Sequence, residues 1–179
     1  MKKVLILHAW FATPGDHWYP WVKEKLEDKG FKVIVPQLKD KDKPTLKDWK
    51  RSALKSCKID EDTIIIGHSL GAVFALRLVE SLNIKIRSLI LVAGWDYWDL
   101  TPEHKTFFAK PVNHKKIINH AGKIIVIHSD NDPYVTQWQA GEFAKRLKAK
   151  FILLKNKGHF TKDDGVTKLP EVVKAAGND

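Results

Sequence analysis

Short runs of aliphatic and β-branched residues alternate along the chain with amphipathic stretches. The apolar runs predict strands at 4–7, 31–35, 64–66, 88–93, 123–128 and 150–154. The stretches between them predict helices at 17–29, 46–57, 72–82, 137–148 and 169–176. Strands that alternate with helices are typical of βαβ crossovers. We therefore expect a parallel sheet with helices on both faces.

The segment 94–121 is the longest without clear periodicity. It begins GWDYWD, contains Phe107 and Phe108, and predicts only a short helix near 114–119. Residues 36–45 are polar and include two prolines, which predicts a loop. Because we find no internal repeat, linker or low-complexity tract, we expect one domain that spans residues 1–179.

The composition is that of a packed globular protein. The chain has 179 residues, of which 44% are hydrophobic, and its single cysteine, Cys57, excludes an intrachain disulfide. The start, MKKVLILHAWFA, superficially resembles a signal peptide, but the apolar run is short, contains His8 and leads into no small-x-small cleavage site. No run approaches the roughly 20 apolar residues of a membrane helix. We expect a cytoplasmic protein without a membrane partner.

The formal net charge of +10 raises the question of nucleic acid binding. Only four of the 31 cationic residues are arginine, and the lysines are scattered, often beside aspartate. Specific readers of nucleic acids favour arginine forks and clustered basic stripes. We interpret the charge as a lysine-rich solvated surface and expect no specific nucleic acid partner. Weak binding to polyanions at low salt stays open as an alternative.

The strongest chemical signal lies in TIIIGHSLGAVFALRLVESL, residues 63–82. A buried strand, the pattern G-x-S-x-G and an apolar helix follow one another, which is the context of a nucleophile elbow. Gly67 and Gly71 allow close backbone approaches at so sharp a turn, and Ser69 projects from its tip. The alternative is that these residues only make a strand-to-helix turn. His68 occupies the variable position of the pattern and is expected to pack there.

A serine nucleophile needs a base, and the base needs a carboxylate that orients it. Such groups gather beyond the carboxyl ends of parallel strands. The loop after the strand at 123–128 supplies Asp130 and Asp132, and the loop after the last strand supplies His159. The chain order Ser, Asp, His is that of α/β-hydrolases. We therefore predict a catalytic serine hydrolase site of Ser69, His159 and one of these aspartates.

Several segments together resemble the small serine hydrolases typified by retinoblastoma-binding protein 9: HAWFATPGDHWYPWVKEKL, PTLKDW, GHSLGA, FFAKPVNHKKI, SDNDPYV and KGHF. The resemblance covers nearly the whole chain. It implies a minimal α/β-hydrolase fold with six parallel strands in the order 2-1-3-4-5-6 and no large cap domain. By motif match the nucleophile is Ser69 and the base His159. We choose Asp132 as the acid because Asp132-Pro-Tyr-Val fits the pattern D-x-x-V/P, and expect Asp130 to cap its loop.

The chain departs from the family at two places. Where family members have His-Gly after the first strand, this chain has His8-Ala9, so a Cβ stands in the oxyanion loop. We expect the backbone N–H groups of Leu70 and Trp10 to form the oxyanion hole, and favour Trp10 over Phe11. The sequence around Cys57 does not match the retinoblastoma-binding motif L-x-C-x-E. That partner is not expected.

Other candidate residues are weighed against simpler roles. Phe11, Trp95 and Trp98 are expected to line an apolar substrate pocket, although they could also fill the core. The metallohydrolase spacing H-x-H-x-D-H is absent, so we expect no metal and no cofactor. His17 is interpreted as a helix-start residue. The remaining histidines of the aperiodic region are expected on the surface or in loops: His104, His114 and His120.

The sequence therefore predicts a serine hydrolase that cleaves small to medium carboxylic ester, thioester or activated amide bonds through an acyl-enzyme. Its partner would be a small-molecule acyl substrate. The alternative is a hydrolase-fold interaction module whose triad is slow or vestigial.

Overall fold

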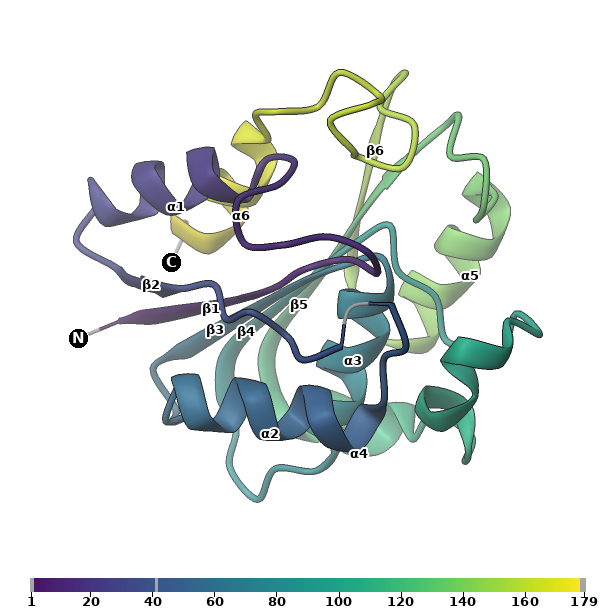
Figure 1. Cartoon of the computed structure of the whole chain (residues 1–179), viewed down its shortest axis with the longest axis horizontal. Coiled ribbons are helices and arrows are strands. Elements are labelled where there is room, and N and C mark those ends of the chain that lie inside the picture. The colour runs from purple at the N-terminus through teal and green to yellow at the C-terminus, as the bar shows by residue number, and fades with distance from the viewer. Residues whose placement is uncertain (1, 41, 178–179) are drawn as a thin grey trace.

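Six strands form one sheet in the computed structural model, which describes residues 2–40 and 42–177 (Figure 1). Residue 41, in the loop predicted at 36–45, lies outside them. All neighbouring strands are parallel and their order is β2-β1-β3-β4-β5-β6, as predicted. The strands are β1 (Lys3–Leu7), β2 (Lys32–Ile34), β3 (Thr63–His68), β4 (Ile86–Val92), β5 (Ala121–Ser129) and β6 (Lys150–Leu154).

Helices cover both faces of the sheet, also as predicted (Figure 1). One face carries α1 (Tyr19–Glu27) and α6 (Pro170–Gly177). The other carries α2 (Leu46–Ser56), α3 (Leu70–Glu80), α4 (His114–His120) and α5 (Gln137–Arg146). The core consequently has two layers, separated by the sheet.

The alternation of side chains along each strand builds the two layers. In β1, Val4 and Ile6 pack with α1 and α6, whereas Leu5 and Leu7 pack with the helices of the opposite face. Because β1, β3, β4 and β5 are central strands, almost all of their apolar side chains are fully buried. This burial on both faces explains why their sequences read as continuous apolar runs.

The aperiodic segment 94–121 lies against α3 and contains a 3₁₀ helix, η1 (Pro102–Phe108), before α4. The buried guanidinium of Arg77 in α3 holds it. Its Nε donates to the carbonyl oxygen of Phe107 at 2.6 Å, and its other nitrogens donate to those of Lys110 and Pro111. These bonds hold the end of η1 and the residues after it against the last turn of α3.

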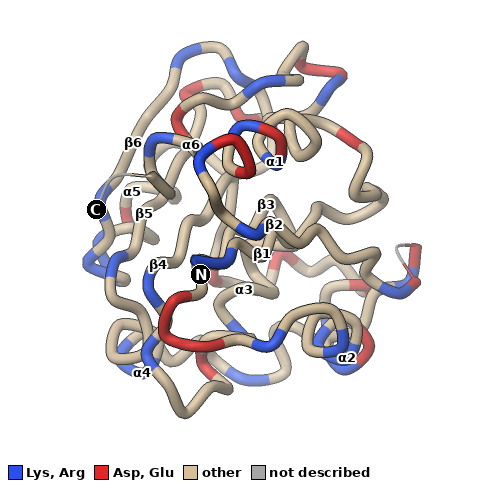
Figure 2. The backbone as a smooth tube through the Cα atoms, turned by 90° about the vertical axis from the view of Figure 1, so that its left-hand side faces the viewer, with Lys and Arg blue, Asp and Glu red and all other residues tan. Residues whose placement is uncertain are grey.

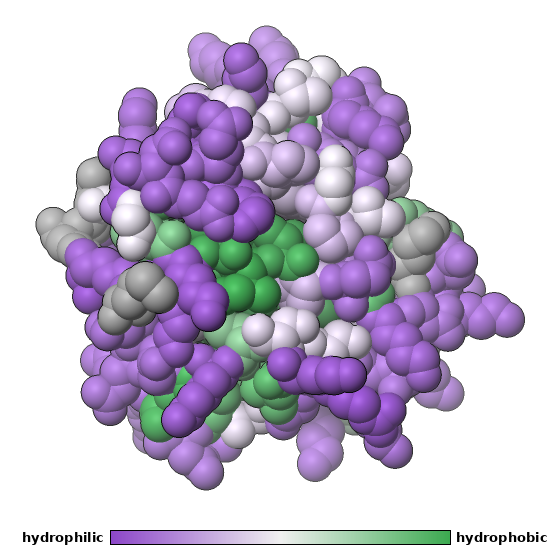
Figure 3. All heavy atoms as spheres, turned by 60° about the vertical axis from the view of Figure 1, so that its left-hand side comes forward, coloured by the Kyte–Doolittle hydropathy of each residue, from purple (hydrophilic) through white to green (hydrophobic). Residues whose placement is uncertain are grey.

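Charged residues are spread over the molecule. In the view of Figure 2, the basic segments lie on most elements and are interleaved with acidic ones. Figure 3 shows a hydrophobic area surrounded by hydrophilic side chains on the side that Figure 1 has at its left. In the edge strand β2, Ile34 is a half-buried apolar residue, and so are Phe31 and Val35 on either side of the strand. Within residues 2–40 and 42–177, no helix is both long and apolar enough to cross a membrane.

Candidate active site

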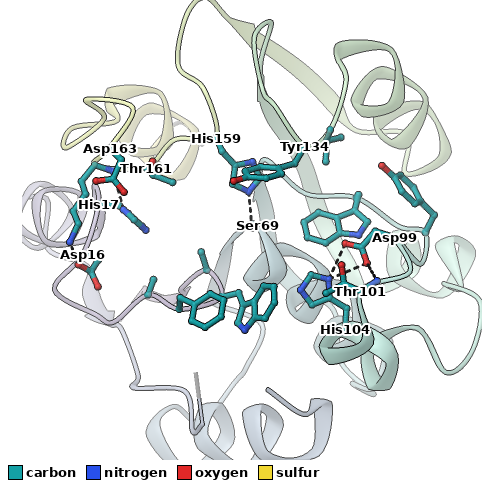
Figure 4. A pocket seen from close by; sticks show the side chains of 18 residues that line it. Asp16, His17, Ser69, Asp99, Thr101, His104, Tyr134, His159, Thr161 and Asp163 are labelled. Carbon is teal, nitrogen blue, oxygen red and sulfur yellow. Dashed lines mark hydrogen bonds and ion pairs between the residues drawn. The ribbon is translucent and has the colours of Figure 1, made fainter. Parts of the chain in front are cut away.

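A cavity of about 590 Å³ opens beyond the carboxyl ends of the strands. Its lining comes from the loops that follow β1, β4, β5 and β6 and from the turn after β3. In Figure 4, Ser69 and His159 lie between two flanks of the cavity. Asp16 and His17 lie on one flank, and His104 lies on the other.

Ser69 alone makes the turn between β3 and α3. It has φ 56° and ψ −126°, a conformation that non-glycine residues rarely adopt and that is common at functional sites. Its N–H donates to the carbonyl oxygen of Val92 at 2.9 Å, which ties the turn to β4. A Cβ on Gly71 would lie 2.5 Å from the carbonyl oxygen of His8 and closer still to that of Leu7. The missing side chain therefore lets α3 start directly against the end of β1.

A chain of hydrogen bonds joins Ser69, His159 and Asp132. The distance from His159 Nε2 to Ser69 Oγ is 2.8 Å, and that from His159 Nδ1 to Asp132 Oδ2 is also 2.8 Å (Figure 4 draws the first). An ionised carboxylate only accepts, so Nδ1 carries a proton, and in the neutral ring the lone pair of Nε2 faces the serine hydroxyl. This is the geometry in which an imidazole can take a proton from the serine.

The Asp132 side chain has no exposed surface. Its Oδ1 accepts hydrogen bonds from the N–H groups of Tyr134 at 2.9 Å and Val135 at 3.1 Å. The exposed ring of Tyr134 lies edge-on against His159, with ring centroids 4.8 Å apart. The candidate acid and the ring of the candidate base are thus held by the same short loop.

Asp130 is an exposed residue of the same loop and is bonded to the loop after β6, not to Ser69 or His159. Its Oδ1 accepts from the N–H of Asn156 at 2.8 Å. Ser129 Oγ and Asn131 Oδ1 accept in the same way from the N–H groups of residues 157 and 158, each at 2.8 Å. Three successive side chains therefore bind the loop after β5 to the loop that carries His159. The sequence reasoning missed the roles of Ser129 and Asn131, although their position beside Asp130 is a local signal.

Asp164 is a further residue that the sequence reasoning missed. Its Oδ2 accepts hydrogen bonds from the N–H groups of His159 and Thr161, each at 3.0 Å. Desolvation opposes its ionisation, but the hydrogen bonds from Thr161 and His159 outweigh it, so the pKa of Asp164 is lowered. The charged carboxylate thereby fixes the backbone of the candidate base.

His68 does more than pack at the elbow, because both of its ring nitrogens form hydrogen bonds. Nε2 lies 2.8 Å from the carbonyl oxygen of His159, which only accepts, so Nε2 carries the proton. Nδ1 then accepts from the hydroxyl of Tyr19 at 2.7 Å, and that hydroxyl accepts from the N–H of Ala9 at 2.9 Å. Burial lowers the pKa of His68 well below its usual value and raises that of Tyr19, so both groups stay uncharged.

This Tyr19–His68 relay joins four parts of the chain: the loop after β1, the start of α1, the end of β3 and the loop after β6. No motif marks it, because Tyr19 and His68 are 49 positions apart. The only sequence signal for this relay was the histidine directly before the serine.

The expected oxyanion residues lie on adjacent segments. Leu70 is the first residue of α3, so its N–H is among those without a partner inside the helix. Trp10 lines the cavity, and the next residue, Phe11, has φ 59°. Since the start of α3 lies against the end of β1 at Gly71, the two backbones meet at the edge of the cavity.

Only two of the three expected pocket residues line the cavity. Phe11 and Trp95 line the cavity. Trp98 does not line it, which corrects the prediction. Its side chain turns to solvent with 47% exposure, and its Nε1 donates to the carbonyl oxygen of Thr101 at 3.4 Å.

The expectation that His104 lies on the surface or in a loop was wrong, because His104 is buried within η1. His104 is only 5% exposed and lines the cavity, because Asp99 accepts from its Nδ1 at 2.9 Å and Trp10 and Trp95 pack against its ring. His114 and His120 are half-buried in α4.

His17 precedes α1 by two residues and lines the cavity instead of starting the helix. Its φ of 54° is left-handed, and its Nδ1 accepts from the N–H of Lys162 at 3.0 Å. The ammonium group of Lys162 also donates a hydrogen bond to Asp16 Oδ1 at 2.9 Å. This hydrogen bond from Lys162 is the main cause that lowers the pKa of Asp16 to about 2. These contacts join the loops after β1 and β6 across one flank of the cavity.

In the described part of the chain, no group of three or more His, Cys, Asp or Glu side chains could hold a metal ion.

Six parallel strands in this order, with a serine at a strained turn after β3, define an α/β-hydrolase fold. A family model described as serine hydrolase matches residues 4–177, and the chain belongs to that family. The expected resemblance to small serine hydrolases is thereby confirmed.

Two relatives of known sequence support the assignment to the serine hydrolase family. The chain is 31% identical to the putative hydrolase YdeN of Bacillus subtilis over 96% of this chain and 92% of the relative. It is 34% identical to the serine hydrolase RBBP9 of Rattus norvegicus over 83% of this chain and 80% of the relative.

Solved structures show the same fold. The crystal structure of the ydeN gene product from B. subtilis matches with a TM-score of 0.89 at 30% identity, covering 98% of this chain and 96% of that one. Est1E from Butyrivibrio proteoclasticus matches with a TM-score of 0.75 over 98% and 85% of the two chains. At 16% identity, Est1E supports the fold alone.

Proposed function

We propose that this serine hydrolase cleaves small to medium carboxylic ester, thioester or activated amide bonds through an acyl-enzyme on Ser69. One observation carries the proposal: hydrogen bonds of 2.8 Å run from Ser69 to His159 and from His159 to Asp132, beginning at a strained turn. Strain of this kind costs on the order of 1–3 kcal/mol and persists where the surrounding structure maintains it.

The reaction follows from the positions of the protons. His159 Nε2 takes the proton of the Ser69 hydroxyl while Oγ attacks the carbonyl carbon of the substrate. The imidazolium that forms is stabilised by the Asp132 carboxylate. It then gives its proton to the departing alcohol, thiol or amine, and the acyl group remains on Oγ. A water molecule, deprotonated by the same nitrogen, attacks the acyl-enzyme and releases the acid and the free serine.

The negative charge of the tetrahedral intermediate is assigned to the backbone N–H groups of Leu70 and Trp10. A donor of this kind contributes a factor of about 10²–10³ to the rate. The position of Leu70 at the N-terminus of α3 supports the assignment, since the helix dipole favours negative charge there. Ala9 adds a Cβ to the oxyanion loop without removing an N–H.

The proposed substrate class rests on the cavity. A volume of about 590 Å³ fits a small to medium acyl group and its leaving group, and aromatic side chains form much of the lining. The chemistry requires no cofactor. The single cysteine supports the further proposal of a cytoplasmic protein, since such compartments keep thiols reduced.

A fluorophosphonate probe tests the activated serine directly. We expect intact mass spectrometry to find one adduct on the wild-type protein and none on Ser69→Ala. Ser81→Ala is the matched control, because Ser81 lies at the far end of α3. It should take one adduct like the wild type, and hydrolysis of short acyl esters should follow the same pattern.

The absence of an adduct on the folded wild-type protein would overturn the proposal. Saturable binding of a protein partner that survives Ser69→Ala, without turnover of any ester, would instead establish an interaction module. An adduct that persists on Ser69→Ala would assign the nucleophile to another residue.

A further inference from the structure

Five buried side-chain nitrogens have no hydrogen-bond partner within residues 2–40 and 42–177. They are Trp18 Nε1, Trp49 Nε1, Trp95 Nε1, His104 Nε2 and His128 Nδ1. A buried polar group left without a partner costs about 1–3 kcal/mol, so each one asks for an explanation. Two of the five residues, Trp95 and His104, line the cavity of the candidate active site. Each of these two residues therefore combines a place in the cavity wall with a buried nitrogen that has no partner in the described part of the chain.

The character of the His104 nitrogen is fixed by its neighbour. Nδ1 lies 2.9 Å from Asp99 Oδ2 and 3.2 Å from Oδ1, so it donates its proton to the carboxylate. The N–H of Thr101 donates to the same carboxylate at 3.2 Å and helps to hold it. In the neutral ring, Nε2 is consequently an acceptor. Figure 4 shows His104, Asp99 and Thr101 together on the flank of the cavity opposite His17 and Asp16.

Trp95 supplies the complementary group. Its indole Nε1–H can only donate, and its side chain is 5% exposed. The ring centroids of Trp95 and His104 lie 5.8 Å apart, so the two unpartnered nitrogens belong to neighbouring rings. One donor and one acceptor on neighbouring rings match a single hydroxyl group, whose oxygen can accept from Nε1–H while its proton goes to Nε2. A carboxylate would leave the acceptor unpaired, and an ammonium would leave the donor unpaired.

The walls around these nitrogens are aromatic. The Trp10 ring meets His104 edge to face at 4.8 Å and stacks with Phe11 at 4.3 Å. The ring of Trp95 is backed by Phe108 at 6.5 Å. Aromatic rings prefer stacked or edge-to-face packing against other rings. The group that carries the hydroxyl is therefore best matched by an aromatic ring.

We propose that Trp95 and His104, with Asp99 as the positioning residue, form a subsite that binds a phenolic hydroxyl group of the substrate. The inference rests on the proposed ester-hydrolase function of Ser69 and specifies its substrate class. The loop after β4 and η1 would then determine whether the protein prefers hydroxylated or plain aromatic substrates.

Matched pairs of esters test the subsite. One pair carries the ring on the acyl side: methyl phenylpropanoate and its para- and meta-hydroxy derivatives. The other carries it on the alcohol side: phenylethyl acetate and its hydroxy derivatives. We expect the wild-type protein to favour a hydroxylated ester of at least one pair by about tenfold or more in kcat/KM, the worth of one to two buried hydrogen bonds.

The variants His104→Phe and Trp95→Phe keep an aromatic ring but remove one of the two nitrogens. In each we expect the ratio of kcat/KM for hydroxylated over plain ester to fall to about one to threefold. Because the readout is a ratio, a general loss of activity or stability does not imitate it, and either variant suffices if the other does not fold. Trp98→Phe is the control, because Trp98 lies outside the cavity lining, and should keep the wild-type ratio.

Binding separates the subsite from the catalysis. Calorimetry with the Ser69→Ala variant should show the same preference for the hydroxylated ester in Kd, and the double variant Ser69→Ala/His104→Phe should lose it. Turnover of plain esters without any preference would overturn the subsite and leave the hydrolase function intact. A preference in Kd without turnover or a fluorophosphonate adduct would overturn the hydrolase function and retain the subsite. A preference that persists in both nitrogen-deleting variants would also overturn the subsite.

Discussion

The carboxylate of Asp132 accepts three hydrogen bonds, from the Nδ1–H of His159 and from two backbone N–H groups. Replacing Asp132 by Asn preserves the shape but offers His159 a donor as well as an acceptor. The imidazole can then adopt the tautomer with a proton on Nε2, which cannot take the proton of Ser69. We expect Asp132→Asn to lower kcat for ester hydrolysis by about 10⁴-fold, measured on purified protein.

Asp130→Asn is the matched control for this prediction. Its side-chain oxygen can still accept from the N–H of Asn156, and the residue is exposed. We expect its kcat to stay within about threefold of the wild type, as for most surface substitutions. Equal losses in the two variants would contradict the choice of Asp132 as the acid.

Single residues differ in how far the sequence predicts them. Ser69, Asp132 and His159 could be predicted to lie together because each occupies a short motif directly after a predicted strand of a parallel sheet. His104 could not, because its burial depends on Trp10 from the first loop and on Asp99, and no periodicity marks either contact. The prediction that Trp98 lines the pocket was wrong for the same reason. Only the fold of segment 94–121 decides which of its aromatic residues face the cavity.

At the level of elements, the Tyr19–His68 relay couples α1 to the two loops that flank the serine. Tyr19→Phe removes the hydroxyl and leaves the N–H of Ala9 and Nδ1 of His68 buried without partners. Each unpaired group costs about 1–3 kcal/mol. We expect the free energy of unfolding, from urea denaturation, to fall by roughly 2–4 kcal/mol.

The same variant should lower kcat at temperatures where it is fully folded, because the relay holds the backbone carbonyl of His159. For the stability measurement, Tyr97→Phe is the control, since Tyr97 is half-buried and likewise loses only a hydroxyl; because Tyr97 lines the cavity, it is no control for kcat. We expect its unfolding free energy to change by less than about 1 kcal/mol. A Tyr19→Phe protein as stable as the wild type would show that the buried hydroxyl contributes nothing.

The elements themselves were largely predictable, but their ends and one segment were not. All six strands and the major helices follow from apolar runs and amphipathic stretches. The helix expected at 72–82 begins at Leu70 because the turn is completed by the left-handed backbone of Ser69. The 3₁₀ helix in segment 94–121 left no pattern, since Arg77 holds its end through backbone carbonyls that any sequence would supply.

For the molecule as a whole, the strand order could be predicted from the family resemblance and the rules of βαβ connection, whereas the polar contacts between loops could not. Those contacts concentrate histidines in the interior. Burial is the main cause that lowers the pKa of His8, His68 and His128, all three of which have fully buried side chains. Stability should therefore depend on pH near neutrality.

The direction in which stability changes with pH depends on how many protons the folded and unfolded states bind. In the unfolded chain these histidines titrate near pH 6.5, but in the folded protein they stay neutral to lower pH, so below about pH 6.5 the unfolded state binds more protons. Stability is then complete above about pH 7 and falls as the pH decreases, with a limit of about 1.4 kcal/mol per pH unit for each histidine. Asp16, with its pKa lowered to about 2, remains ionised throughout this range and adds no slope.

Urea denaturation at pH 7.5, 6.5 and 5.5 measures this dependence. We expect the free energy of unfolding to decrease by roughly 1–4 kcal/mol between the first and the last condition, with most of the loss below pH 6.5. His128→Asn removes one titrating group and should give a shallower decrease, whereas His114→Asn alters a half-buried histidine of α4 and serves as the comparison. A constant stability across these conditions would mean that the buried histidines take up protons as readily in the folded protein as in the unfolded chain, which their desolvated positions oppose.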